Sequence, residues 1–416
     1  MNRTSFQNNI VITLGLLISP IAGLTLSFAS LSRTGDNRYK HIIISLAFFF
    51  IMLYMPPMAD LFRHYLVFSA AKDAGISYFT GDSLDLTLPM VMYLFKVFSI
   101  PFYYLSPVFL SLSVFLMYRS LDYALTKYSY YNKSITVYII INVSALLITP
   151  IFIIASGLRF GLACFIIIYA IFKYTNGGIG LRTFLFLTLL SALTHFSMFV
   201  FLFLPFAIAF FSGSRREAVA YFLTCSVFSV VAPIIIYSIP ALNTPYIHAY
   251  ISGEFSSLSG KNINGIIVYS FQFLPTLLLL IYFMLNENSE LSLLRKACTF
   301  IIIVTCLSMF SAELFQRFNI IAMFSLYLYF ILSMRLKLSG LNNALIYLLL
   351  LVITFFYFSF QSVYVFRNQV LLGKMVYSLY EPPIHKLFSV DRDFYRAVKQ
   401  LNPETGEWVG HEAASE

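Results

Sequence analysis

The chain has 416 residues, of which 59% are hydrophobic and 11% are charged. Soluble domains carry about 25% charged residues and do not enlarge a single core beyond about 250–300 residues, so this composition excludes a soluble enzyme, a nucleic-acid-binding protein and a disordered chain. The net charge of +9 is typical of a membrane protein whose Lys and Arg gather in cytoplasmic loops. Because the apolar runs are long and continuous, rather than short and alternating as in a β-barrel, the sequence predicts an all-α polytopic membrane protein.

The first apolar run covers residues 10–31. It is too long for the apolar part of a signal peptide, which has about 7–15 residues. It is also followed by Arg33, Arg38 and Lys40, which resist translocation. A helix needs about 20 residues to cross the hydrocarbon core, so this run is predicted to be one transmembrane helix with the N-terminus outside.

Further apolar runs bring the expected total to about twelve transmembrane helices. The segment 86–100 differs, because it contains Lys96 between Pro89 and Pro101, and we expect a re-entrant or interface helix there. With this assignment the inside loops hold more Lys and Arg than the outside segments, as the positive-inside rule requires. The other predicted spans are 42–57, 102–118, 135–154, 156–172, 183–194, 197–211, 218–239, 265–285, 298–312, 318–334 and 341–360.

Residues 1–360 are therefore predicted to form a single transmembrane domain with two external loops, 58–85 and 241–264. Residues 361–416 are predicted to be a C-terminal tail, placed outside by the number of spans before it. The four cysteines lie inside apolar runs and have no metal-ligand spacing. We expect no metal ion and no other cofactor.

Three arginines lie on the predicted outside, within a few residues of a span end: Arg63, Arg159 and Arg317. An Arg at that depth usually faces the protein interior or a watery cavity, and its planar fork binds phosphate through two hydrogen bonds. Snorkelling to the headgroups, or an ion pair with Asp60 or Glu313, would also explain any one of them. Three on one side of the membrane favour an anion-binding site.

His195 lies in the middle of the apolar run 183–211, which is too long for one span and too short for two full ones. The sequence predicts a tight external turn or an unwound point there, which a membrane tolerates only inside protein or beside a cavity. His195 is then either a buried histidine bonded to a backbone carbonyl or a proton acceptor, since imidazole titrates near neutral pH.

Asp60 opens the first external loop, three residues before Arg63 and four before His64. On a helix both basic side chains could lie on the same face as Asp60, so a local cap or ion pair is one interpretation of this group. Asp82 and Asp85 are interpreted as turn or capping residues of the same loop.

The second external loop combines aromatic and polar side chains. It contains Tyr246, His248 and Tyr250, followed by Glu254. This mixture suits a sugar-binding surface, and it equally suits an interfacial aromatic belt.

Four short motifs follow one another along the predicted outside face: Asp60-x-x-Arg63-x-Tyr65, Ser156-Gly157-Leu158-Arg159-Phe160-Gly161-Leu162-Ala163, Ala192-Leu193-Thr194-His195-Phe196-Ser197 and Gln316-Arg317-Phe318. In this order they resemble the bacterial polysaccharide polymerases of the Wzy type, in particular their EpsG-like branch. The resemblance covers residues 40–335, in spacing and hydropathy more than in identity. Two positions depart from the family pattern: Met58-Ala59-Asp60-Leu61 stands where Gly-Thr-Asp-Tyr is frequent, and Phe160 stands where Gln often follows the arginine.

The resemblance implies a GT-C-like membrane glycosyltransferase in the bacterial cytoplasmic (inner) membrane. Its substrates would be oligosaccharide repeat units on undecaprenyl diphosphate, joined at the outer (periplasmic) face into O-antigen or capsular polysaccharide. Apolar grooves would house the lipid, and a chain-length regulator protein would be a further partner. Arg63, Arg159 and Arg317 would hold the diphosphate leaving group. His195 or Asp60 would take the proton of the acceptor hydroxyl, and we favour His195. The implied glycan contacts are Tyr65, Tyr246, His248 and Tyr250.

Two other classes of function stay open at the level of sequence. A lipid-linked oligosaccharide flippase or another transporter would also use charges in the membrane, but it predicts inverted repeats and polar residues near the midplane. An O-antigen ligase or a membrane acyltransferase would also use outside His or Arg residues. No internal repeat is visible, and the notable charges are concentrated on the outside face, which favours the polymerase.

Overall fold

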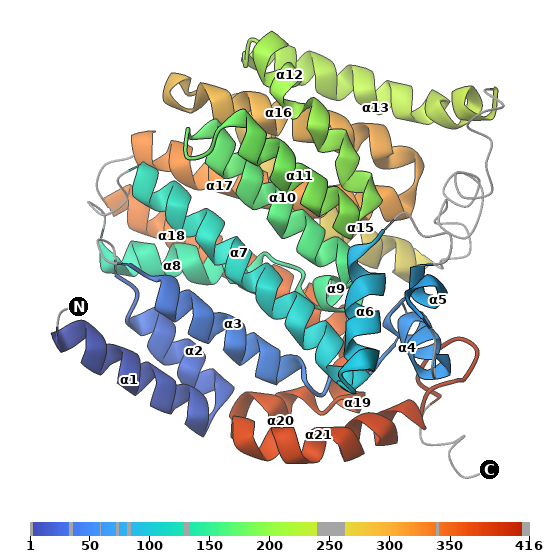
Figure 1. Ribbon diagram of the computed structural model, residues 1–416. Helices are drawn as coiled ribbons and strands as arrows, with labels where there is room; N and C mark the ends of the chain where they lie inside the picture. Colours follow the sequence, from blue (N-terminus) through green and yellow to red (C-terminus); the bar gives the residue numbers. More distant parts are fainter. Residues whose placement is uncertain are drawn as a thin grey trace.

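The computed structural model describes residues 3–32, 36–58, 60–71, 75–80, 85–128, 134–238, 263–337 and 341–409. Within these ranges the chain is all-helical: helix accounts for 83% and no strand forms, apart from one isolated antiparallel bridge between Leu401 and Trp408. The helices pack into one bundle (Figure 1). We call the end where α3 begins the inner end, and the opposite end, where α4 begins, the outer end, after the sides predicted from the sequence.

The first apolar run forms two helices instead of one. α1 (Arg3–Ile18) ends before Ser19, whose side chain caps α2 (Pro20–Ala29) by accepting a backbone N–H. α2 folds back along α1, so closely that a Cβ added at Gly23 would lie 2.9 Å from α1. The predicted single span over 10–31 is therefore wrong, and the chain begins at the inner end (Figure 1). Because the pair returns to its starting side, the sides predicted for the later helices are unchanged.

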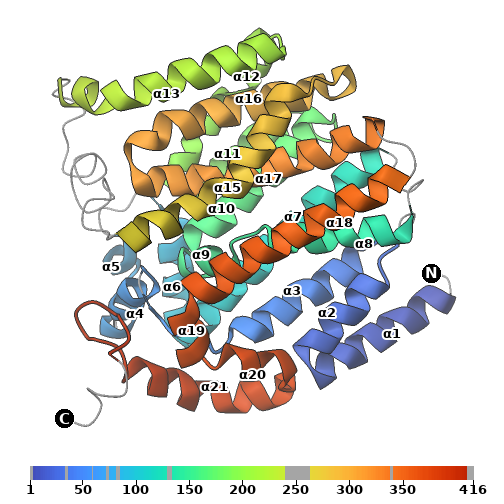
Figure 2. The same ribbon diagram turned by 180° about the vertical axis from the view of Figure 1, so that it is seen from behind.

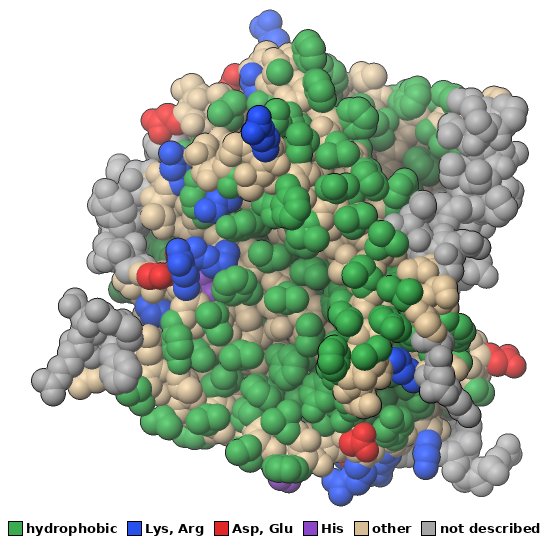
Figure 3. All heavy atoms as spheres, viewed as in Figure 1, with side chains coloured by type: hydrophobic (Ala, Val, Ile, Leu, Met, Phe, Trp, Pro, Cys, Tyr) green, Lys and Arg blue, Asp and Glu red, His purple; other side chains and the backbone are tan. Residues whose placement is uncertain are grey.

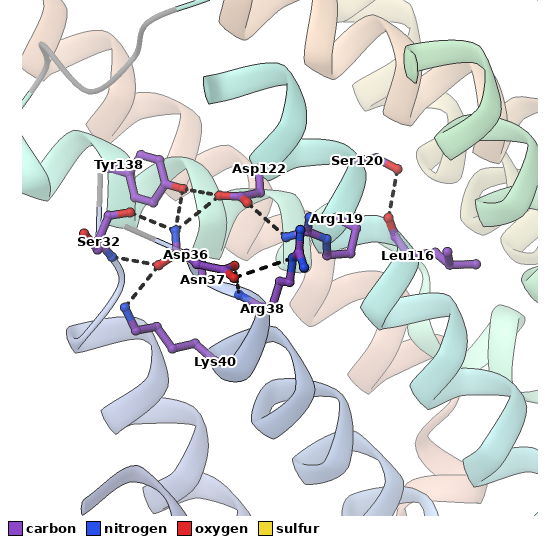
Figure 4. A network of polar contacts seen from close by, with 10 residues as sticks. All are labelled: Ser32, Asp36, Asn37, Arg38, Lys40, Leu116, Arg119, Ser120, Asp122 and Tyr138. Carbon is purple, nitrogen blue, oxygen red and sulfur yellow. Dashed lines mark hydrogen bonds and ion pairs between the residues drawn. The ribbon is translucent and has the colours of Figure 1, made fainter. Parts of the chain in front are cut away.

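A buried polar network joins three helices at the inner end (Figure 4). Asn37, just before α3 (Arg38–Met52), donates to Asp122 of α7 (Leu105–Lys127) and to Tyr138 of α8 (Ile135–Leu147), at 3.2 Å each. Asp122 also accepts from Tyr138 at 3.0 Å and from Arg119 at 3.2 Å, and Lys40 donates to Asn37 at 3.1 Å. These bonds fix how the three helices meet, so we assign this cluster a structural role.

The centre of the bundle consists of α7, packed between α3 and α10 (Arg159–Thr175) (Figure 1). Small side chains on these helices are completely buried, among them Ala47, Ser113 and Ala163. Small residues let helices approach closely, which is the main source of helix association where lipid removes the hydrophobic driving force.

Short helices lie along the outer end between α3 and α7: α4 (Asp60–Ala70), α5 (Ile76–Thr80), α6 (Thr87–Val97) and η1 (Phe102–Tyr104). α6 starts beside the end of α11 (Leu181–Thr194), where the N–H of Leu86 donates to the carbonyl of Leu193 at 2.8 Å. It ends where the chain enters η1 and α7. Its 11 residues extend about 16 Å, against about 30 Å for the hydrocarbon core. Both ends of α6 therefore lie at the outer end, and α6 does not cross the bundle.

The remaining helices complete the bundle (Figures 1 and 2). Their bounds are α9 (Ile151–Ser156), η3 (Phe196–Phe203), α12 (Leu204–Phe210), α13 (Arg215–Ser238), α15 (Ile263–Leu285), η5 (Ser289–Leu291), α16 (Ser292–Leu307), η6 (Ser308–Phe310), α17 (Ala312–Lys337), α18 (Leu341–Phe358) and the π-helical segment η7 (Ser359–Val365). Two of them lie directly at the site described below: α9 precedes α10, and α17 begins at the outer end.

The segment predicted as a C-terminal tail folds onto the bundle. After η7 it forms α19 (Arg367–Leu372), α20 (Met375–Tyr380) and α21 (Pro383–Val398), which pack at the outer ends of α2 and α3 (Figure 2). Lys386 of α21 is completely buried and donates to the carbonyl of Phe50 at 3.1 Å and to that of Ser378. These bonds make the C-terminal helices an integral part of the outer end.

The surface of the bundle suits a lipid environment. Five helices in the described part of the chain are long and apolar enough to cross a membrane: Phe102–Lys127, Arg215–Ile236, Ser289–Phe310, Ala312–Met334 and Leu345–Val365. Large apolar side chains are exposed along the bundle, for example Phe186 and Val230, and Figure 3 shows hydrophobic side chains across the middle of one face. Since a soluble protein would not expose such a surface, the chain is a helical membrane protein.

Candidate functional site

A cavity of about 590 Å³ opens at the outer end. The start of α4, the break between α9 and α10, the turn after α11 and the start of α17 all contribute to its wall. Five residues predicted from the sequence to form the site line this cavity: Asp60, Arg63, Arg159, His195 and Arg317. Residues that are far apart in the sequence are thus neighbours in space.

The break between α9 and α10 makes Arg159 the first residue of α10. Leu158, directly before it, has φ 24° and ψ −86°, which a non-glycine residue rarely adopts, and complete burial of its side chain holds it there. Gly161 allows α9 and α10 to approach, because a Cβ there would lie 2.4 Å from Ile154. The break directs the N-terminus of α10 at the cavity, and with it the positive end of the helix dipole.

Each of the three arginines has a carboxylate partner. The pairs are Arg63 with Asp60 at 2.6 Å, Arg159 with Asp85 at 2.7 Å and Arg317 with Glu313 at 3.9 Å. The side chains of Arg159 and Arg317 are about a quarter exposed, at 28% and 24%, and this exposure is toward the cavity that they line. A guanidinium has five N–H donors, so a single carboxylate does not saturate it, and an anion can bind beside the carboxylate.

Asp85 connects two walls of the cavity. Its position in the sequence predicts a turn or capping role, and its Oδ1 does accept the backbone N–H of Phe196 at 2.6 Å. Its Oδ2 accepts from Nη1 of Arg159 at 2.7 Å. The side chain is 11% exposed, and it holds the start of α10 against the turn that carries His195. The sequence signal for this role is a carboxylate placed directly before an apolar helix, where a buried charge needs a partner.

His195 forms the junction between α11 and η3 and is 6% exposed. Its Nε2 lies 3.4 Å from Nη1 of Arg317, and its Nδ1 lies 2.8 Å from Oγ of Ser197. A guanidinium can only donate, so Nε2 accepts and the ring proton resides on Nδ1, which donates to Ser197. The lone pair of Nε2 is therefore directed toward Arg317.

The imidazole of His195 is neutral at physiological pH. Burial, followed by the charges of Arg317 and Arg159, lowers the pKa of His195 to about 3, against the opposite effect of Asp60. Among the charged neighbours, each of the two arginines has a larger effect than Asp60. An anion bound to them would reduce the positive potential at this side chain and raise the pKa of His195.

Phe160 forms an apolar wall beside these polar groups and is 4% exposed. The centroid of its ring lies 5.3 Å from that of His195, at 80°. The same ring lies 5.8 Å from Cζ of Arg317, within reach of a cation–π contact. A residue at the second position of α10 therefore orients both His195 and Arg317.

Asp60 is an ionised acceptor at the start of α4. Burial alone would raise the pKa of Asp60. The nearby His64, whose Nε2 lies 3.7 Å from Oδ2 of Asp60, and then the charges of Arg63 and Arg159 outweigh burial and hold this pKa below its usual value. A carboxylate with a lowered pKa is a weaker base. Of the two predicted proton acceptors, His195 is therefore the better candidate once an anion is bound.

The C-terminal loop adds two residues that the sequence analysis did not predict, Glu404 and Thr405, to the wall of the cavity. The loop packs on α4, where Trp408 lies against the cluster around Phe62. Gly406 has φ 69°, and a Cβ there would lie 2.6 Å from the ring of Phe62, so only glycine allows this approach. No helical periodicity marks the loop, which explains why the sequence pattern did not reveal its role.

Of the four predicted glycan contacts, Tyr65 is the one that lies within the described residues, and it is not at this cavity. Tyr65 packs between Phe102 and Phe394, with ring centroids 5.5 Å and 5.7 Å away, and it does not line the cavity. Its ring is used in packing α4 against η1 and α21. The other three predicted contacts, Tyr246, His248 and Tyr250, lie outside the described residues.

The cavity offers three kinds of chemistry: positive charge for an anion, a neutral imidazole that can accept a proton, and ionised carboxylates that can accept hydrogen bonds. Among the residues that the structure describes, no group of three or more His, Cys, Asp or Glu side chains is placed to hold a metal ion. The positive charges of Arg63, Arg159 and Arg317 can stabilise an anionic ligand in this cavity.

No family model matches this chain, and neither a curated protein nor a solved structure matches it. The indications of function therefore come from the chemistry of the cavity and from the membrane setting of the helices.

Proposed function

We propose that this chain is a polysaccharide polymerase of the Wzy type, which joins oligosaccharide repeat units carried on undecaprenyl diphosphate at the outer face of the bacterial cytoplasmic membrane. The observation that carries this proposal is the meeting of Arg159, Arg317 and His195 in one cavity. They come from three separate elements, and two of these elements, α10 and α17, begin at the cavity.

The arginines would hold the diphosphate of the donor. Arg159 stands at the N-terminus of α10, where the helix dipole and the guanidinium act on the same ligand. The lowered pKa of His195, caused by burial and then by Arg317 and Arg159, supports a positive potential at this point. Groups so placed stabilise the negative charge that develops on the leaving diphosphate.

His195 would serve as the general base. The oxygen of the acceptor hydroxyl attacks the anomeric carbon of the donor, and the bond from this carbon to the diphosphate oxygen breaks. The diphosphate keeps the bonding electrons. In this proposal Arg317 turns from Nε2 of His195 to the diphosphate, and the hydroxyl proton moves to the lone pair of Nε2 that Arg317 has released. Binding of the diphosphate to Arg159 and Arg317 raises the basicity of His195, so the base becomes effective only when the donor is in place.

An apolar groove supports a lipid-linked substrate. A cavity of about 530 Å³ lies between α15, α17 and α18 and is lined almost entirely by apolar side chains, among them Leu278, Phe330 and Tyr357. These helices run beside one another on the face seen in Figure 2. In this proposal a polyprenyl chain would occupy this groove. The helices from α3 onward would cross the membrane as predicted from the sequence, and the α1–α2 pair adds one pass to the predicted twelve. α6 is the re-entrant or interface helix, in the manner of GT-C-like glycosyltransferases.

Deletion of the gene tests this function in the source organism. Surface glycan with a single repeat unit and no ladder is the expected result, because only the joining of units is lost. Loss of the first unit as well would contradict the proposal and indicate a ligase or a flippase. The purified protein should also lengthen undecaprenyl-diphosphate-linked units when no other protein is added.

A further inference from the structure

A second and larger cavity, of about 820 Å³, lies among the C-terminal helices and carries no role in the transfer proposed above. Its wall is formed by Tyr54 after α3, by α19, α20 and α21, and by the C-terminal loop up to Trp408. None of the residues predicted from the sequence to act in catalysis or in diphosphate binding lines it.

Aromatic rings cover a large part of this wall. Tyr377 and Tyr380 of α20 are 74% and 66% exposed, and Trp408 of the loop lines the same cavity. Exposed aromatic side chains with an apolar ring and a polar tip suit a ligand that has both apolar surfaces and hydrated polar groups. The C–H faces of sugar rings are such a surface.

Polar side chains of both charges stand between the aromatic rings. Glu381 and Asp393 can only accept hydrogen bonds, whereas Lys374 and Arg396 can only donate. The two charges of each sign balance, so the cavity does not select a strong anion. A hydroxyl group donates and accepts at once, so a ligand with many hydroxyls can satisfy all four side chains.

We propose that this second cavity binds a stretch of neutral oligosaccharide. The aromatic rings would pack against the sugar faces, and the four charged side chains would bind the hydroxyls. This is the usual composition of a ligand pocket, in which apolar and aromatic walls provide contact and a few polar groups fix orientation.

The two cavities are neighbours. Phe366 lines the first cavity, and Leu371 and Leu372, at the other end of α19, line the second. In the C-terminal loop, Thr405 lines the first cavity and Trp408 lines the second. Three residues of chain span at most about 11 Å, so an oligosaccharide of a few units can reach from one cavity to the other.

Because the second cavity lies beside the first, binding there would affect how the growing glycan is extended. A glycan held in the second cavity stays close to the transfer site between two rounds of extension. The binding itself is inferred from the cavity alone, whereas its role in holding the growing glycan rests on the proposed function.

The only tryptophan of the chain is Trp408, so intrinsic tryptophan fluorescence reports on the second cavity directly. The probe consists of oligosaccharides released from the surface polysaccharide of the source organism, freed of lipid and phosphate, and titrated into the purified full-length protein. We expect a saturable change in emission. Tyr377→Ala and Asp393→Asn should each weaken the binding by about tenfold, as expected for one stacked ring or one hydrogen-bonded carboxylate.

A matched control is Phe388→Ala on α21, since Phe388 is 85% exposed but does not line the cavity. This variant should bind like the unaltered protein. An unchanged emission throughout the titration, or an equal loss of binding in Tyr377→Ala and Phe388→Ala, would overturn the inference.

The surface glycan separates this inference from the proposed function. Tyr377→Ala should still produce a ladder, but one shifted to shorter chains. A ladder of normal length with this variant would refute the holding role. If the protein binds the oligosaccharide but does not polymerise repeat units, the inferred binding site stands and the proposed polymerase function is rejected.

Discussion

Asp85 and Arg159 are 74 residues apart in the chain, yet their side chains meet at 2.7 Å. The second oxygen of the same carboxylate accepts the backbone N–H of Phe196, the residue after His195. One buried carboxylate thus holds Arg159, which is proposed to bind the diphosphate, near His195, the proposed base. A change at Asp85 should therefore act on both.

We expect Asp85→Asn to reduce glycan extension by about ten- to a hundredfold, which corresponds to a coupling of about 1.4–2.8 kcal/mol. The amide keeps the size of the side chain but loses the charge that orients Arg159. In an assay with purified protein, the KM for the lipid-diphosphate donor should rise more than the KM for the acceptor.

The double variant Asp85→Asn with Arg159→Lys separates positioning from general damage. If Asp85 acts through Arg159, the second substitution adds little to the loss caused by the first. Fully additive losses would show that Asp85 serves only the start of η3, through its bond to Phe196.

Arg159→Lys should abolish most extension at normal protein abundance. Lysine keeps the positive charge but cannot bind a phosphate through two parallel hydrogen bonds, whereas a headgroup anchor would tolerate the exchange. Arg317→Lys should behave similarly. Arg38→Lys is the matched control, because the Arg38 side chain is 69% exposed at the inner end, and it should leave the ladder intact.

His195→Ala should stop chain extension while the protein still inserts and accumulates. A general base contributes about 10²–10⁴ in rate, whereas a structural imidazole would cost only the stability of its hydrogen bonds. Ser197→Ala should have a smaller effect, because Ser197 only accepts the Nδ1 proton. A full-length ladder from His195→Ala at normal abundance would remove this residue from the mechanism.

Lys386 predicts a pH dependence of stability. Burial lowers the pKa of Lys386 from 10.5 to about 7, against the effect of Glu381. Between these two values the unfolded chain binds the proton and the folded chain does not, so folding becomes more favourable as the pH rises from about 7 to about 10. In thermal unfolding of the detergent-solubilised protein, wild type should gain stability over this range.

The variant Lys386→Met should lack that gain, whereas Lys399→Met, at an exposed lysine of the same region, should keep it. The comparison isolates one titration from all others in the protein. Identical pH profiles for wild type and Lys386→Met would mean that Lys386 is charged in the folded chain throughout the range.

The membrane sides can be measured with single cysteines in a Cys-free background. Arg63 and Arg215 are both exposed and lie at opposite ends of the bundle, so cysteines there should be labelled from opposite sides. The same experiment at residue 8, in α1, should give the side of Arg215, since α1 begins at the inner end. Labelling of residues 63 and 215 from one side would contradict the arrangement of the spans.

The sequence was sufficient to predict a helical membrane fold and the residues that meet in the first cavity. Composition decides the fold class, because so few charges leave no soluble alternative. Arg159, His195 and Arg317 could be selected because a polar group in apolar surroundings requires a partner or a function. Each of the three was identified from the apolar residues next to it in the sequence, without knowledge of any tertiary contact.

What the sequence did not reveal depends on contacts between distant segments. The role of Asp85 requires Arg159 and Phe196 to be placed beside it, and the loop at Trp408 acquires its role only by packing on α4. The fold-back at Ser19 corresponds to a Ser-Pro pair, which is typical of a helix start, whereas the length of the apolar run predicts a single span. Local patterns specify helices, whereas the walls of both cavities come from tertiary packing.

The C-terminal loop also has a consequence for biosynthesis. Residues 401–409 leave the ribosome after every helix described here, and they complete the wall of both cavities. A nascent or prematurely terminated chain can therefore insert all of its helices and still lack a finished site. Under the proposed function, such incomplete chains in the membrane would leave the lipid-linked precursors unextended.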